Sequence, residues 1–77
     1  MRNKPTDIIF IFSTNLRRIR MQKGFSQREL SARCNVDNAD ISRMENGDIN
    51  ITLRTLEQLA NALDVAILEL LTIHHQQ

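Results

Sequence analysis

Apolar residues recur at helical spacings in the first third of the chain. Separations of four, four and three residues place one set on a single helix face: Ile8, Phe12, Leu16 and Ile19. Thr6 or Asp7, just before this set, can cap the first N–H groups of a helix, and Gly24 can adopt the left-handed conformation that ends one. The pattern therefore predicts a helix from about residue 7 to residue 23.

Capping signals divide the following residues into two short helices. Ser26 and Glu29 form a capping box, which predicts the start of the second helix. Asp37 is the expected N-cap of a third helix that runs to about Glu45 and is ended by residues 46–47. Between them we expect Asn35 to turn the chain with a positive φ, which Asn tolerates better than most residues.

The last third of the chain predicts two more helices. Thr52 is the expected cap of a fourth helix, and the apolar set predicted to face inward is Leu53, Leu56, Leu59, Ala60 and Leu63. A fifth, short and very apolar helix is expected from about residue 65 to residue 73. With three aromatic residues and two glycines in 77 residues, a β-sandwich or barrel is disfavoured. The prediction is an all-α, five-helix fold in a single domain spanning residues 1–77.

The small size of the chain raises the question of what stabilises it. A domain of this length buries only about 60% of its unfolded surface, so a monomer is marginal. Cys34 is the single cysteine, which excludes an intrachain disulfide and favours a buried thiol in a reducing cytoplasm over a redox sensor. Close helix packing or oligomerisation is the remaining source of stability.

The charges are distributed unevenly along the chain. Residues 1–33 carry eight Lys or Arg and two acidic residues, a net +6, whereas residues 34–77 carry two Arg and seven acidic residues, a net −5. Such a chain can present a basic side to an anionic partner. No apolar run reaches the length of a membrane span, and none is typical of a signal peptide, so we expect a cytoplasmic protein.

The second and third helices, joined by a short turn, form a helix-turn-helix over about residues 26–46. Residues 26–37 (SQRELSARCNVD) and 41–47 (ISRMENG) resemble the lambda-repressor/Cro-type (XRE) family, and residues 53–56 and 59–63 resemble its fourth helix. The resemblance covers about residues 12–71. It implies a lambda-repressor-like fold and a sequence-specific transcriptional regulator, such as a repressor or controller protein, that reads double-stranded DNA through the major groove.

The resemblance also implies roles for individual residues. It assigns base contacts to Asn38, Ala39 and Arg43. Of these, Arg43 can bind O6 and N7 of guanine, and Asn38 can read adenine. It assigns contacts with the DNA backbone to Gln27, Ser42 and Asn46, and an internal ion pair to Arg20 and Glu45.

Three acidic residues depart from the family pattern beside this surface: Asp37, Asp40 and Asp48. Each opposes phosphate binding, although Asp40 can also accept a hydrogen bond from N4 of cytosine. We therefore place further phosphate contacts on Arg28 and Arg17. A solvated helix face accounts equally well for three of the arginines: Arg17, Arg18 and Arg33.

Both ends of the chain carry more apolar residues than one helix face accounts for. We expect residues 1–11 and 65–77 to be dimerisation or tail segments, with these residues in a homodimer interface: Ile9, Phe10, Ile67, Leu70, Leu71 and Ile73. A two-fold dimer places two recognition helices about 34 Å apart on a palindromic operator. In the alternative arrangement, residues 8–12 form a β-strand that pairs between subunits.

A second class of function remains open. The acidic residues also fit a protein-interaction module on a helix-turn-helix scaffold, such as an antitoxin-like protein that binds a partner protein and binds DNA weakly or not at all. No spacing typical of a catalytic triad, a phosphate-binding loop or a metal site is present, and the two histidines, His74 and His75, are adjacent near the end of the chain. We therefore expect no enzyme activity, no cofactor and no bound metal.

Overall fold

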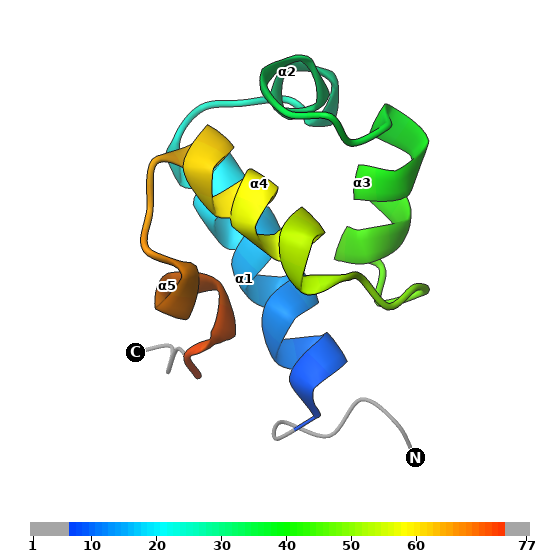
Figure 1. Cartoon of the computed structure of the whole chain (residues 1–77), viewed down its shortest axis with the longest axis vertical. Helices are drawn as coiled ribbons and strands as arrows, with labels where there is room; N and C mark the ends of the chain where they lie inside the picture. The colour runs from blue at the N-terminus through cyan, green and yellow to red at the C-terminus, as the bar shows by residue number, and fades with distance from the viewer. Residues whose placement is uncertain (1–6, 74–77) are drawn as a thin grey trace.

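The structure, a computed structural model, describes residues 7–73. Its five helices follow in the order α1 (Ile8–Gln22), α2 (Gln27–Arg33), α3 (Asn38–Glu45), α4 (Leu53–Leu63) and α5 (Ile67–Leu71), and the described region contains no strand (Figure 1). The all-α, five-helix prediction is confirmed. Residues 1–6 and 74–77, including the pair His74 and His75, lie outside the described residues.

Most helix ends follow the local signals in the sequence. The Asp7 carboxylate accepts from the N–H of Ile9 at 2.9 Å, and the Thr52 hydroxyl accepts from the N–H of Thr55 at 3.0 Å. Both hydrogen bonds of the predicted capping box form between Ser26 and Glu29. These side chains satisfy N–H groups that have no partner within the helix.

Three local features differ from expectations drawn from the sequence. Asn35 does not take a positive φ, because the turn is closed by other contacts: the Ser31 hydroxyl donates to the carbonyl of Val36 at 2.7 Å. Asp37 is the N-cap residue of α3, as predicted, although its side chain makes no capping hydrogen bond. Residues 8–12 belong to α1 rather than to a β-strand. In addition, α5 is shorter than expected, at Ile67–Leu71, and its N-cap residue Ala66 makes no side-chain capping hydrogen bond.

The core lies between α1 and the other helices. α1 packs against α3 and α5, and α4 packs against α2 and α5. Every helix contributes a fully buried side chain to this core, namely Leu16, Leu30, Ile41, Leu59, Leu63 and Leu70. Burying a leucine or isoleucine side chain contributes about 1.5–3 kcal/mol, so Leu30 and Ile41 fix the two short helices of the motif to the rest of the domain.

The burial of two apolar residues, Leu70 and Leu53, differs from the prediction. Leu70 is fully buried inside the protomer, so it does not belong to a surface between two copies. Leu53, predicted to face inward, is 84% exposed because it occupies the first turn of α4, beyond the end of the core. The apolar surface is therefore differently composed from the one predicted.

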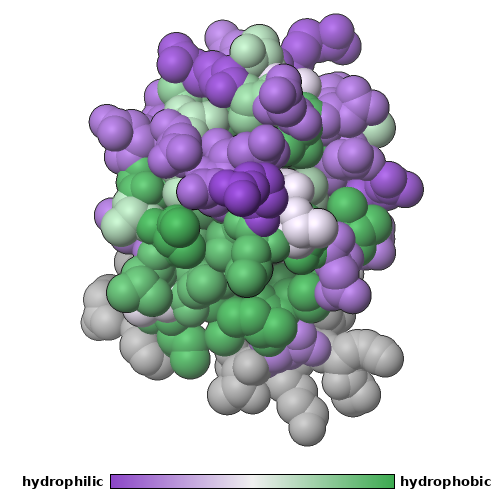
Figure 2. Space-filling model, in the orientation of Figure 1, coloured by the Kyte–Doolittle hydropathy of each residue, from purple (hydrophilic) through white to green (hydrophobic). Residues whose placement is uncertain are grey.

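Polar and apolar residues separate on the surface. In the view of Figure 2, hydrophilic residues cover the upper half, over α2, and hydrophobic residues gather on the lower half, over α5 and the starts of α1 and α4. None of the described helices combines the length and the apolar character that crossing a membrane requires.

Candidate nucleic-acid interface

The outer side of α3 is open to solvent. Ile41 and Met44 are buried at 0% and 4% exposure and hold the helix against the core. At about 100° per residue, the positions opposite this stripe are Ala39, Ser42, Arg43 and Asn46. Ala39, Arg43 and Asn46 are exposed and Ser42 is half-buried. Four residues predicted to contact DNA therefore share one accessible helix face.

Arg43 is not isolated on this face. Its Nη2 donates to Oδ1 of Asp40 at 2.5 Å, one turn earlier in α3. The side chains of both residues are solvent-accessible, at 57% and 40%. The sequence spacing of three residues, which places two side chains side by side on a helix, could have indicated this pair.

Asn38 lies at the first position of α3 and is half-buried. Its Oδ1 is shielded from solvent and has no hydrogen-bond partner within the described region. Reading adenine requires both the oxygen and the nitrogen of the amide at the base edge. In this orientation the side chain does not offer both atoms, so the predicted adenine contact requires it to rotate.

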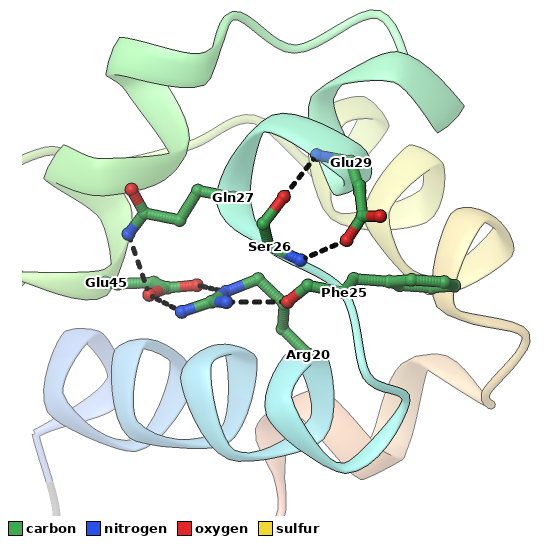
Figure 3. Close-up of polar contacts among 6 residues, drawn as sticks. All are labelled: Arg20, Phe25, Ser26, Gln27, Glu29 and Glu45. Atoms are coloured by element: carbon green, nitrogen blue, oxygen red, sulfur yellow. Dashed lines mark hydrogen bonds and ion pairs between the residues drawn. The ribbon is translucent and has the colours of Figure 1, made fainter.

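A polar network fixes the orientation of α3 relative to α1 and α2. The predicted Arg20–Glu45 pair forms: Nε of Arg20 lies 2.6 Å from Oε2 of Glu45, and Nη2 lies 3.0 Å from Oε1 (Figure 3). Nη1 of Arg20 also donates to the carbonyl of Phe25 at 2.7 Å. The side chains of Arg20 and Glu45 are 11% and 2% exposed, and their hydrogen bond raises the pKa of Arg20. Arg20 is therefore held inside the protein.

Gln27 joins this network from the first position of α2. Its Nε2 donates to Oε1 of Glu45 at 3.1 Å (Figure 3). An amide nitrogen carries two hydrogens, so one N–H group remains for another acceptor. The Arg20–Glu45–Gln27 network thus places the Gln27 amide relative to α3, a link that the sequence did not reveal.

Two arginines outside this network are also predicted to bind phosphate. Arg28 and Arg17 are both exposed. Arg17 lies within one helical turn of Ser13, which lies near Gly47, and of Arg20, which pairs with Glu45 at the end of α3. Arg17 therefore lies on the side of α1 that adjoins α3.

Two further arginines make contacts within the protein. Arg18 donates to Oδ1 of Asn15 at 3.0 Å, and Asn15 in turn donates to the carbonyls of Leu70 and Thr72 at the end of α5. The guanidinium of Arg33 lies 4.4 Å from the centre of the Phe25 ring. Both arginines thus have structural contacts, and Arg18 serves the α1–α5 packing.

Cys34 is half-buried and packs beside the core, rather than being fully buried. Its Sγ donates to the carbonyl of Leu30 at 3.2 Å, and burial raises the pKa of the thiol. A thiol with a raised pKa is less reactive at neutral pH, which fits the structural role expected from the sequence.

Outside the polar face, the structure contains an apolar groove of about 270 Å³ between the starts of α1 and α4. The residues that line it are Ile8, Ile9, Phe12, Asn50, Ile51, Thr52, Leu53, Leu56 and Leu71. Ile9 and Leu71, predicted dimer residues from opposite ends of the chain, meet here. Phe10, Ile67 and Ile73 are exposed to 38%, 42% and 46%.

Within residues 7–73 no cluster of three His, Cys, Asp or Glu side chains forms a potential metal site.

Comparison with known proteins identifies the family. A family model described as helix-turn-helix matches residues 16–70. A hypothetical transcription factor of Neisseria meningitidis serogroup B is 38% identical over 65 residues, which are 84% of this chain and 61% of that protein. The chain therefore spans less than two thirds of the length of this relative. A crystal structure of the hypothetical transcription factor NHTF from Neisseria has a TM-score of 0.86 at 36% identity, covering 91% of this chain and 80% of that one.

Two restriction-modification controller proteins are also similar. The structure of C.AhdI from Aeromonas hydrophila has a TM-score of 0.78 at 34% identity, covering 80% of this chain and 94% of that one. C.Esp1396I, solved as a tetramer in complex with its natural 35 base-pair operator, has a TM-score of 0.74 at 29% identity, covering 84% and 96%. The chain belongs to the helix-turn-helix family of the lambda-repressor/Cro (XRE) type, as its sequence motifs predicted.

Proposed function

We propose that this protein is a non-catalytic transcriptional regulator that binds a palindromic operator as a homodimer, with α3 in the major groove. The observation that carries the proposal is the solvent-facing side of α3, held in a fixed orientation by Ile41, Met44 and the Arg20–Glu45 pair. The controller protein C.Esp1396I, which has the same fold, was solved on its operator, and this supports the proposal.

The proposed contacts follow from exposure and chemistry. Arg43 offers a guanidinium for O6 and N7 of guanine, and Ala39 a methyl group for the methyl of thymine. Asn38 reads adenine after its side chain rotates. Gln27, Arg28, Arg17, Ser42 and Asn46 position the protein on the DNA backbone.

The apolar groove is the proposed dimer interface. Its rim contains Leu53, the most exposed large apolar residue of the described region, and a second copy related by a two-fold axis would bury that side chain. Among the residues expected in the interface, Ile9 and Leu71 line the groove; Phe10, Ile67 and Ile73 are exposed apolar residues that extend the apolar surface.

The size of the protomer is compatible with this arrangement. It measures 32 × 25 × 20 Å. In a two-fold dimer, equivalent points are separated by twice their distance from the axis, so a spacing of about 34 Å requires α3 to lie about 17 Å from the axis, which is within the extents of the protomer. Adjacent major grooves on one side of B-DNA are about 34 Å apart, so a two-fold dimer can place both α3 helices in them.

The proposal is tested by titrating the protein with random-sequence duplex DNA at about 50 mM and 200 mM salt, followed by selection from a random duplex library. We expect affinity for random DNA to fall steeply with salt, because bound phosphates release counterions. The selected sequences are expected to be palindromic, with half-sites about one helical turn apart.

The rival function predicts a different result in the same experiment. The exposed residues Asp37 and Asp48 beside α3 are the observation that favours a module for binding a partner protein. No DNA binding at about 50 mM salt would support that module and reject the operator-binding regulator.

A further inference from the structure

We propose that Asp40 is a positioning residue that sharpens the selection of guanine by Arg43 and weakens binding to all other DNA. This inference rests on the proposed function. It starts from the Asp40–Arg43 pair, with Oδ1 of Asp40 2.5 Å from Nη2 of Arg43.

The geometry leaves Arg43 able to bind a base. A guanidinium has five N–H groups, and Asp40 accepts one of those on Nη2. The other N–H of Nη2 and those of Nη1 remain available for the paired acceptors O6 and N7 of guanine. Asp40 therefore restricts the rotation of the guanidinium without occupying the edge that reads the base.

In the free protein this ion pair contributes little to stability. Both side chains are solvent-accessible, and in exposed pairs of this kind screening by water offsets most of the attraction between the charges. Docking on DNA removes water from around the pair, and the attraction between the charges becomes stronger as the local dielectric falls. The orientation of Arg43 is therefore held most firmly in the complex.

The charge of Asp40 has a second consequence. A carboxylate on the DNA side of the protein repels phosphates on every sequence. If the target base is not guanine, Arg43 lacks its paired acceptors, and turning it toward a phosphate instead leaves Asp40 without its partner. Unfavourable contacts with the wrong sequence raise specificity in the same way as favourable contacts with the right one.

The test compares single-base variants of a duplex that the wild-type protein has selected from a random library. Asp40→Asn keeps the size of the side chain and removes its charge. We expect the preference for guanine to fall about threefold to tenfold, at the same base position that Arg43→Ala affects. Affinity for random duplex DNA is expected to rise about twofold to fivefold.

A matched control separates positioning from simple repulsion. Asp37→Asn removes an exposed charge at the start of the same helix; its side chain makes no capping hydrogen bond, and Asn is an equally good N-cap. This variant is expected to raise affinity on all duplexes equally and to leave base preference unchanged. In an Arg43→Ala background, Asp40→Asn is expected to leave the remaining preference unchanged.

Two results would overturn the proposal. If Asp40→Asn raises affinity on all duplexes by one factor, as the control does, Asp40 acts only through its charge. If it changes preference at a base position that Arg43→Ala does not affect, Asp40 reads a base itself. Absence of DNA binding by the wild-type protein is a separate outcome, which rejects the proposed function.

Discussion

The two ends of the molecule are built on different principles. At the helix-turn-helix end, polar groups find partners within the protomer: Glu45 accepts from Arg20 and Gln27, and Ser26 and Glu29 satisfy each other. At the opposite end, the apolar groove and exposed Leu53 have no partner within residues 7–73. Apart from the amide oxygen of Asn38, the first end is fixed by contacts within one copy, whereas the second end leaves apolar surface in contact with water.

This difference separates two requirements of the proposed function. Reading DNA requires a recognition helix whose direction does not change, and internal hydrogen bonds and ion pairs provide directional constraints. Association between copies requires surface whose burial is favourable in itself, and the hydrophobic effect provides that without directional bonds. Substitutions at the two ends should therefore affect different measurements.

The largest effect is expected from Leu53→Asp at the apolar end. The change places two charges in the proposed interface, one from each copy. Burying an unpaired carboxylate is strongly unfavourable, so the dimer should dissociate and operator affinity should fall at least about 100-fold. Size-exclusion chromatography with light scattering measures the mass, and a DNA titration measures the affinity.

Met21→Asp is the matched control for this substitution. Met21 is also an exposed apolar residue, at 58%, but it lies near the end of α1 and does not line the groove. Its substitution should leave the mass unchanged. Equal dissociation by both variants, or a wild-type protein that is monomeric at about 100 μM, would contradict a dimer that forms through the groove.

At the polar end, Glu45→Ala is expected to act on the stability of the protomer rather than on association between copies. It leaves the guanidinium of Arg20, 11% exposed, without its charged partner. Breaking a buried pair in this way costs about 3–5 kcal/mol. Urea denaturation at fixed protein concentration measures the loss. Arg54→Ala breaks the exposed pair with Glu57 and should cost less than about 1 kcal/mol, and similar losses in both variants would contradict the structural role of the Arg20–Glu45 pair.

Arg43→Ala is expected to act on recognition rather than on stability. Its side chain is exposed, so the free energy of unfolding should change little. Binding to the selected operator should weaken by about 1–3 kcal/mol, with relaxed preference at one base position. Titration of single-base variants checks this. Equal weakening on every sequence would instead indicate that Arg43 binds a phosphate.

The smallest effect concerns Cys34, beneath the turn of the motif. Because burial raises the pKa of this thiol, the folded protein should contain less thiolate than the unfolded chain at the same pH. Iodoacetamide at pH 7.5 should therefore alkylate the native protein several-fold more slowly than the urea-unfolded protein. Because the pKa of this thiol is higher in the folded protein than in the unfolded chain, its contribution to the free energy of unfolding is fully present below the pKa of the unfolded chain. The contribution is lost as the pH rises through the pKa of the folded protein. Equal alkylation rates, measured by mass spectrometry, would contradict the burial.

Sequence patterns predicted the helices and the family more completely than the surface. The capping residues Asp7, Ser26 and Thr52 identified helix starts because such signals act within a few residues of the chain. The family motifs led to the Arg20–Glu45 pair. They did not reveal that Gln27 joins the pair, because the family resemblance assigns Gln27 to the DNA backbone and its contact with Glu45 depends on how α2 packs beside α3.

The predictions that failed depended on surroundings more than on pattern. Leu53 and Leu70 are chemically identical and both fit a helical stripe, yet one is 84% exposed and the other is fully buried. Asn35 has the residue type that a left-handed turn favours, but Ser31 and Val36 close the turn without one.

The amino-acid order of this protein thus specifies where its helices start, which family it belongs to and which residues lie on the recognition helix. Those properties depend on spacing and on contacts between near neighbours in the chain. Only the assembled fold decides which apolar residues remain outside, how Gln27 meets Glu45 and where the start of α1 lies beside the end of α5. These features arise where helices distant in sequence exclude water from one another, and no local pattern contains that information.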